Sequence, residues 1–130
     1  MRKYLALLAT AAAIAAGTVT VTAAPAHAAL RNCTGETAYS NKSSGTASLI
    51  GTGINYRTGP DHNTCTSLGT WNQSSGYYLY LWCYTYGSYV SNGQQGSNVW
   101  WFGRRSGTSQ QGWISSLYTI ESGTSNSDQC

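Results

Sequence analysis

Groups that transfer protons are scarce in this chain. Its 130 residues hold four acidic side chains and two histidines, whereas general acid–base catalysis or an activated nucleophile needs such groups within hydrogen-bond reach of one another. No serine stands in a G-x-S-x-G elbow, which marks one large class of hydrolases. His62 follows Gly59-Pro60-Asp61, a combination typical of an exposed turn. We therefore expect a protein that is not an enzyme and has no catalytic residue.

Long apolar runs are lacking except near the N-terminus. Residues 1–3 carry two positive charges, residues 5–16 are almost entirely apolar, and Ala26-His27-Ala28 is a small-x-small triplet, which together are typical of a secretory signal peptide. A membrane-spanning helix needs roughly 20 mostly apolar residues, but glycine and threonines interrupt this run at residues 17–22. We predict that residues 1–28 are removed and that the protein is secreted, extracellular or associated with the cell wall.

The exported part is too weakly charged to indicate a nucleic acid or a membrane as its partner. Loss of Arg2 and Lys3 leaves five basic and four acidic side chains, a net charge of +1. Binding to nucleic acids or anionic membranes usually needs a stronger positive field. The 102 residues from Ala29 to Cys130 fit one small domain, which we expect to be a monomer.

The four cysteines lack the C-x-x-C spacing of a zinc site, and His62 is a lone candidate ligand near Cys65. We expect neither a metal nor another cofactor. An even number of cysteines in a small exported domain instead predicts disulfides, with three possible pairings for four cysteines. We favour Cys65–Cys83 as a link inside the core and Cys33–Cys130 as a clasp between the two ends.

The remaining composition favours an all-β fold with long polar loops. Glycine, serine, threonine, asparagine and tyrosine dominate, and no window keeps apolar residues at helical spacing. We expect residues 29–45 to form a polar lead-in arm, residues 46–120 to form the domain, and residues 121–130 to form a surface tail held by Cys130.

Residues 77–86 give the strongest strand signal. Successive side chains of a strand point to opposite faces, so Leu79, Leu81 and Cys83 are predicted to share a core face. The opposite face would carry a ladder of aromatic rings. Its members are Tyr78, Tyr80, Trp82, Tyr84 and Tyr86. This ladder is either a platform for a ligand, because amphipathic rings tolerate a half-wet position, or a surface packed under the lead-in arm or a neighbouring strand.

A second pair of strands is predicted at residues 99–102 and 112–115, joined by a hairpin turn at residues 103–107. Alternation places Val99 and Trp101 on the face opposite Trp100 and Phe102, so one pair can lie in the core and the other can be exposed. The two arginines of the turn are expected to be solvated.

Several segments together resemble the bacterial SH3 (SH3b) domain, in particular its secreted actinobacterial versions. They are Ile54-Asn55-Tyr56-Arg57-Thr58-Gly59-Pro60, Ser67-Leu68-Gly69, the strand ending at Cys83, Trp100-Trp101 and Gly112-Trp113-Ile114-Ser115-Ser116-Leu117-Tyr118. The resemblance covers roughly residues 46–120 and implies a small, strongly bent β-barrel. The chain departs from simpler members of the family in its four cysteines and in an insertion at residues 84–98, which is placed where it can cover a ligand groove.

The resemblance implies binding rather than catalysis, because such domains attach secreted proteins to cell-wall peptidoglycan, often through its cross-bridging peptide. Arg57, Gly59, Pro60, Gly112 and Trp113 are expected to serve the architecture. The expected contact set is Asn55, Tyr56, Tyr80, Trp82, Tyr84, Trp100 and Tyr118. The alternative is an adaptor, inhibitor or toxin-complex subunit that binds another secreted protein, since tryptophan and tyrosine are frequent interface hot spots.

Overall fold

The computed structural model describes residues 33, 39–74 and 76–130. The predicted signal peptide and most of the predicted lead-in arm, at residues 29–32 and 34–38, lie outside the described residues. Within the described residues, no helix has the length and apolar character needed to cross a bilayer.

The described part consists of strands joined by turns, which confirms the predicted all-β fold. Seven strands and two short 3-10 turns follow one another along the chain. They are β1 (Thr46–Leu49), β2 (Ile54–Arg57), β3 (Ser67–Trp71), β4 (Leu79–Ser91), β5 (Gly96–Arg105), β6 (Gln111–Ser115), η1 (Ser116–Tyr118), β7 (Thr119–Ser122) and η2 (Asn126–Asp128).

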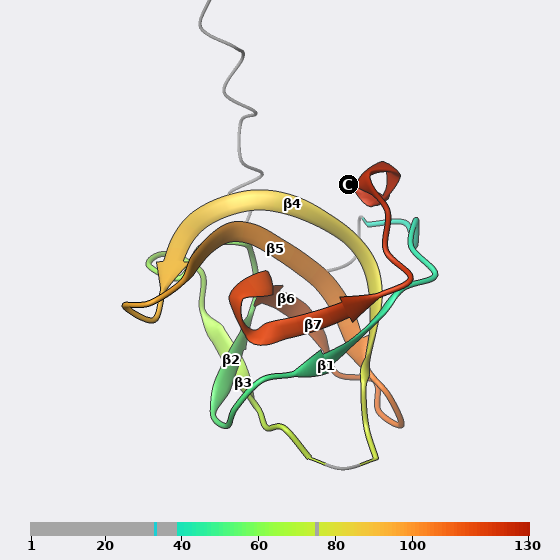
Figure 1. Ribbon diagram of the computed structural model, residues 1–130, viewed down its shortest axis with the longest axis horizontal. Coiled ribbons are helices and arrows are strands. Elements are labelled where there is room, and N and C mark those ends of the chain that lie inside the picture. Colours follow the sequence, from blue (N-terminus) through green and yellow to red (C-terminus); the bar gives the residue numbers. More distant parts are fainter. Residues whose placement is uncertain (1–32, 34–38, 75) are drawn as a thin grey trace, which may run out of the picture.

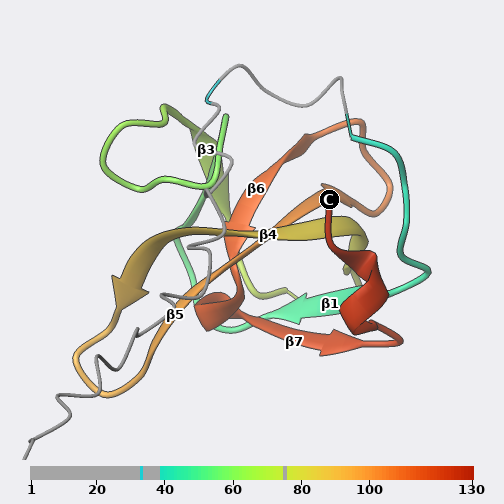
Figure 2. The ribbon, with the colours of Figure 1, turned by 90° about the horizontal axis from the view of Figure 1, so that it is seen from above.

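All seven strands belong to one antiparallel sheet in the order β3-β2-β6-β5-β4-β1-β7. The long strands β4 and β5 form a curved ribbon that arches over the shorter strands (Figure 1). Seen from above, β1 and β7 lie side by side (Figure 2), as their pairing from Thr46 with Ser122 to Leu49 with Thr119 requires. The sheet is therefore strongly curved, and side chains on both of its faces are buried.

Two clusters make up this core, one for each face of the central strands. The first contains Leu79, Leu81, Trp101 and Ile114 with residues of β1 to β3, and the second contains Cys83, Trp100, Phe102 and Trp113. Trp100 and Trp101 are 2% and 5% exposed, so the predicted division into a core pair and an exposed pair is wrong. Each face is covered because the bent sheet folds over one side and Tyr39 packs on the other, with its ring centroid 5.0 Å from that of Trp113.

A β-bulge at Trp82 interrupts the alternation of β4. Leu81 lies opposite Gly103 and Cys83 lies opposite Phe102, so Trp82 is one extra residue in the pairing. Such an insertion reverses the face of every side chain beyond it. Cys83 therefore joins the cluster of Phe102, away from Leu81. The prediction that Cys83 shares a face with Leu79 and Leu81 is wrong for this reason.

The bulge also explains the disulfides. Their presence is confirmed, but the favoured pairing is wrong, because the structure joins Cys33 to Cys65 and Cys83 to Cys130. Beyond the bulge, Cys83 faces the C-terminal tail, where the Cys130 N–H donates to the Tyr84 carbonyl at 2.9 Å. Cys65 lies in the loop after β2, where it forms its disulfide with Cys33.

The turn between β5 and β6 lies further along the chain than predicted. Strand β5 continues through Arg105 and the turn begins at Ser106, so Arg104 and Arg105 are not solvated turn residues. The Arg104 guanidinium lies 4.9 Å from the centroid of the Tyr80 ring, and that of Arg105 lies 4.1 Å from the Tyr77 ring. Cation–π contacts of this kind hold long arginine side chains against the sheet.

Candidate functional site

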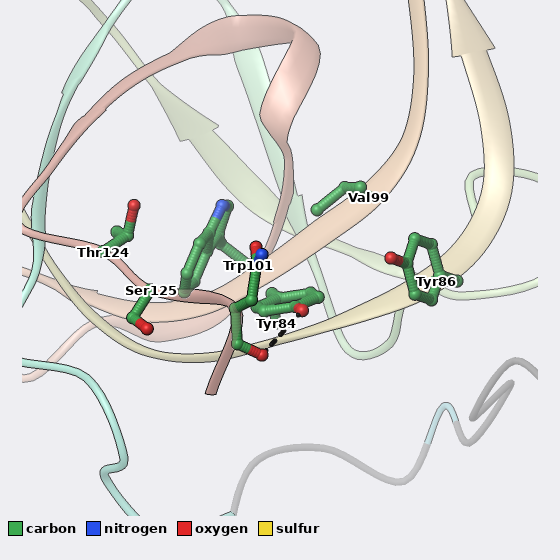
Figure 3. A pocket seen from close by; sticks show the side chains of 7 residues that line it. Tyr84, Tyr86, Val99, Trp101, Thr124 and Ser125 are labelled. Carbon is green, nitrogen blue, oxygen red and sulfur yellow. Dashed lines mark hydrogen bonds between the residues drawn. The ribbon is translucent and has the colours of Figure 1, made fainter. Parts of the chain in front are cut away.

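The aromatic residues beyond the bulge line a pocket of about 460 Å³, which we call the tyrosine pocket (Figure 3). Strands β4 and β5 provide one wall, made mainly of rings, and the tail provides the other, made of hydroxyl and amide groups. The lining residues are Tyr84, Tyr86, Val99, Trp101, Thr124, Ser125 and Asn126. The bulge causes this arrangement, because it turns Tyr84 toward Trp101.

The rings of this pocket are held at fixed angles. The Tyr84 and Trp101 centroids are 5.2 Å apart, and Tyr86 meets Tyr84 edge-on at 6.0 Å. The Tyr84 hydroxyl donates to the Asn126 carbonyl at 3.1 Å, drawn as the dashed line in Figure 3. Burial, followed by the neighbouring Tyr86 and Asp128, raises the pKa of Tyr84 above the ordinary tyrosine value of 10.0. Tyr84 is therefore neutral at physiological pH.

The tail wall is ordered by its own capping interactions and by a disulfide. The Ser125 N–H donates to Asp128 Oδ2 at 2.8 Å, and the Ser125 hydroxyl caps η2 in return. The Cys83–Cys130 bond and the Lys42 ammonium, 3.0 Å from the Gln129 carbonyl oxygen, fix the end of the tail. Residues 124–126 are absent from the predicted contact set. The S-x-x-D spacing of Ser125 and Asp128 could have indicated an ordered turn there.

A second pocket, of about 410 Å³, lies between β2, the loop after it, β5, β6 and η1. We call it the arginine pocket. Its lining residues are Thr52, Gly53, Ile54, Asn55, Arg57, His62, Val90, Trp100, Ser115 and Tyr118. It brings together three members of the predicted contact set, Asn55, Trp100 and Tyr118. The Trp100 indole N–H already donates to the Ser88 carbonyl at 2.9 Å.

The other predicted contact residues lie elsewhere. Tyr56 is buried and stacks on Trp71, with centroids 4.2 Å apart and the rings 5° from parallel, so it belongs to the core. Tyr80 is half-buried, and its hydroxyl is 2.9 Å from that of Tyr78. Of the predicted set, only Tyr84 lines the tyrosine pocket.

Trp82 packs rather than forming a platform with the other rings. Its ring meets Phe102 edge-on at 5.5 Å, and its carbonyl accepts the N–H groups of Lys42 and Ser43 at 2.8 and 2.9 Å. The end of the lead-in arm therefore crosses β4 at the bulge. The ladder predicted from alternation is thus divided between a packed portion around Trp82 and an open portion at Tyr84 and Tyr86.

The described residues offer binding surfaces but few reactive groups. Across residues 33, 39–74 and 76–130, no three histidine, cysteine, aspartate or glutamate side chains gather as a metal site. All four cysteines are in disulfides. The lining residues offer rings for stacking, hydroxyl and amide groups for hydrogen bonding and, in the arginine pocket, the Arg57 guanidinium and the His62 imidazole. No protein-family model, curated protein or solved structure matches the chain.

Proposed function

We propose that the protein is an exported, non-catalytic binding module that attaches to bacterial cell-wall peptidoglycan through the tyrosine pocket. The observation that carries this proposal is a wall of aromatic rings facing a wall of hydroxyl and amide groups, with no formal charge among the described lining residues. Aromatic faces pack against apolar ligand faces, and a few placed polar groups fix the ligand orientation. A neutral glycan or peptide segment of the wall offers both kinds of surface.

The disulfides and the bent sheet support the same proposal. Two disulfides indicate an oxidising environment such as the extracellular space. The bent antiparallel sheet, with η1 leading into its last strand β7, agrees with the SH3b-like barrel that the sequence motifs imply. The insertion at residues 84–98 extends β4 and β5 and contributes Tyr84 and Tyr86 to the pocket.

A secreted protein partner is the second candidate. It is favoured by Tyr89, which is 64% exposed near the tip of the β4–β5 ribbon, and by Leu68, which is 48% exposed at the sheet edge. Exposed tyrosines of this kind often become interface hot spots. This candidate predicts binding through the ribbon tip and not through the tyrosine pocket.

Co-sedimentation with purified peptidoglycan sacculi separates the two candidates. The protein is expected to sediment with sacculi at both low and high salt, because the tyrosine pocket is uncharged. Tyr86→Ala should weaken this binding by about 2 kcal/mol, the scale of an interface hot spot. Tyr89→Ala is the matched control, since it removes an equally large ring that lies outside the pocket, and it should bind as the unaltered protein does.

Two results would refute wall binding through this pocket. One is failure of the folded protein to sediment with sacculi while it captures a single protein from culture medium. The other is a loss of sedimentation in Tyr89→Ala with none in Tyr86→Ala, which would move the contact to the ribbon tip.

A further inference from the structure

The arginine pocket has a charge that the tyrosine pocket lacks. Arg57 is the one permanently charged side chain among its described lining residues, and none of them is acidic. Asp61, close by in the sequence, is not a lining residue, and its Oδ1 accepts the N–H groups of Asn63 and Thr64 at 2.8 and 3.3 Å. A ligand entering this pocket therefore meets a positive centre.

The guanidinium of Arg57 is positioned before any ligand arrives. Its Nη1 donates to the Cys65 carbonyl at 2.9 Å, and Cys65 is tied to Cys33. The backbone of Arg57 pairs with Ser67 on one side and with Trp113 on the other. A guanidinium has five N–H donors in a rigid fork, and in the described part of the chain the Cys65 carbonyl is its single hydrogen-bond acceptor, with no carboxylate paired to it.

Two further polar side chains surround this centre. Asn55 Oδ1 accepts from the Ser67 hydroxyl at 2.8 Å, which leaves the amide NH₂ group of Asn55 for another partner. The Ser88 hydroxyl oxygen accepts the His62 backbone N–H and lies 2.9 Å from His62 Nδ1. When the Ser88 hydroxyl donates its proton to Nδ1, Nε2 carries the ring N–H and can donate to a ligand.

We propose that the arginine pocket binds the terminal carboxylate of a short peptide. Arg57 forms the ion pair, since its fork matches the two oxygens of a carboxylate, and Asn55 and His62 donate further hydrogen bonds. Trp100 and Tyr118 supply apolar walls for the last side chains of the peptide. The volume of about 410 Å³ lies within the usual range of ligand sites.

This site is separate from the one in the proposed function. The two pockets share no lining residue, so the arginine pocket can bind a peptide whether or not the tyrosine pocket binds the wall. Any peptide with a free C-terminal carboxylate and small terminal side chains is expected to bind, because the pocket recognises the carboxylate group.

A pair of small probes tests the proposal on the full chain, expressed with its own leader and purified in the oxidised form. The probes are N-acetyl-alanyl-alanine with a free carboxylate and the same dipeptide as its C-terminal amide, followed by ¹H–¹⁵N chemical-shift titration. The carboxylate form is expected to bind about tenfold more tightly, as a charge-assisted hydrogen bond requires. The shifts should centre on Gly53, Trp100 and Tyr118.

Four variants test which residue carries the effect. Arg57→Gln should remove the preference for the carboxylate, and Asn55→Ala, at an exposed position, should weaken binding even if Arg57→Gln fails to fold. Arg104→Gln is the matched control, because it removes the same charge from a residue that lines neither pocket. Tyr86→Ala should leave peptide binding intact, so failure of the wall proposal is distinguishable from failure of this one.

The proposal is overturned by any of three results. The acid and the amide bind equally, or Arg104→Gln costs as much as Arg57→Gln and so reveals a net-charge effect, or the shifts centre on Tyr84 and Trp101. Carboxylate preference that survives in Asn55→Ala but is lost in Arg57→Gln supports Arg57 as the ion-pairing residue.

Discussion

Gly87 holds the long ribbon against the loop that carries His62. The N–H of the next residue, Ser88, donates to the Pro60 carbonyl at 3.0 Å, and the Trp100 indole lies against the same point. A side chain on Gly87 would collide with the Pro60 carbonyl oxygen and would lie 2.8 Å from Trp100 Cδ1. This close approach of two backbone segments explains why only glycine fits.

Gly87→Ala is therefore expected to lower the free energy of unfolding by roughly 3 kcal/mol, at the upper end of overpacking costs, because backbone atoms must move. Gly96→Ala is the matched control in the same ribbon. There the new methyl group meets only the ring of Tyr89, which is 64% exposed and free to rotate away. Urea denaturation of both variants measures the difference, and equal stabilities would contradict the close-approach argument.

Tyr84 gives the stability a dependence on alkaline pH. Because its pKa is raised above 10.0 in the folded protein, an unfolded chain loses this proton at a lower pH than the folded protein does. The contribution of Tyr84 is fully present below pH 10 and is lost as the pH rises through its raised pKa. The free energy of unfolding should therefore fall above pH 10.

Tyr84→Phe removes this titration together with the hydrogen bond to the Asn126 carbonyl. We expect a loss of about 1 kcal/mol at neutral pH, the usual net value of a hydrogen bond, and a shallower decline of stability above pH 10. Denaturation at a series of pH values provides the measurement, and phenolate absorbance reports the number of titrating tyrosines. An unchanged slope in Tyr84→Phe would show that other groups cause the alkaline decline.

Among the elements, β4 shows most clearly what the sequence could predict. The strand itself and the burial of Leu79 and Leu81 follow from continuous β-favouring residues and alternation. The bulge does not, because Trp82 favours a strand as strongly as its neighbours and no glycine or proline marks the insertion. The bulge instead coincides with a contact from a distant segment, since the Lys42 and Ser43 N–H groups both donate to the Trp82 carbonyl. Alternation therefore predicts faces correctly only up to that residue.

The tail is the element on which the tyrosine pocket depends. Replacing both Cys83 and Cys130 by alanine should reduce the free energy of unfolding by about 4 kcal/mol in the chain-entropy description of disulfides. Residues 124–126 should then lose their hydrogen-exchange protection, because the capping turn of η2 is short and exposed. Binding to sacculi should weaken in parallel. Retained protection in the tail would show that its hydrogen bonds to β4 suffice without the covalent link.

At the scale of the whole molecule, each disulfide supports a different pocket. Cys83–Cys130 fixes the tail wall of the tyrosine pocket, whereas Cys33–Cys65 fixes the loop whose carbonyl positions Arg57. The sequence predicts the all-β class and the presence of two disulfides, because composition and cysteine number report on the whole chain. It does not predict their pairing, because pairing depends on which face of β4 carries Cys83.

This division predicts a reciprocal effect of the two disulfides on binding. Replacing Cys33 and Cys65 by alanine should weaken the acetylated dipeptide carboxylate and leave sedimentation with sacculi largely unchanged. The Cys83 and Cys130 double variant should show the opposite pattern. Parallel titration and sedimentation of both folded variants provide the measurement, and loss of both activities in either variant would show that the pockets are coupled through the sheet.

The extra residue Trp82 determines which face of β4 carries each side chain that follows it, and therefore which rings line the tyrosine pocket. If β4 paired with β5 regularly at unchanged length, Cys83 would move to the face of Leu81 and Tyr84 to the opposite face, which would separate Cys83 from the tail and remove Tyr84 from the pocket. Deletion of Trp82 itself would keep Cys83 opposite Phe102 and Tyr84 opposite Trp101, whereas deletion of a residue between Cys83 and Tyr86 would shift the faces beyond it. An alignment with related chains must place the extra residue at position 82 correctly. Only then can the aromatic residues of β4 be compared position by position and used to infer what the protein binds.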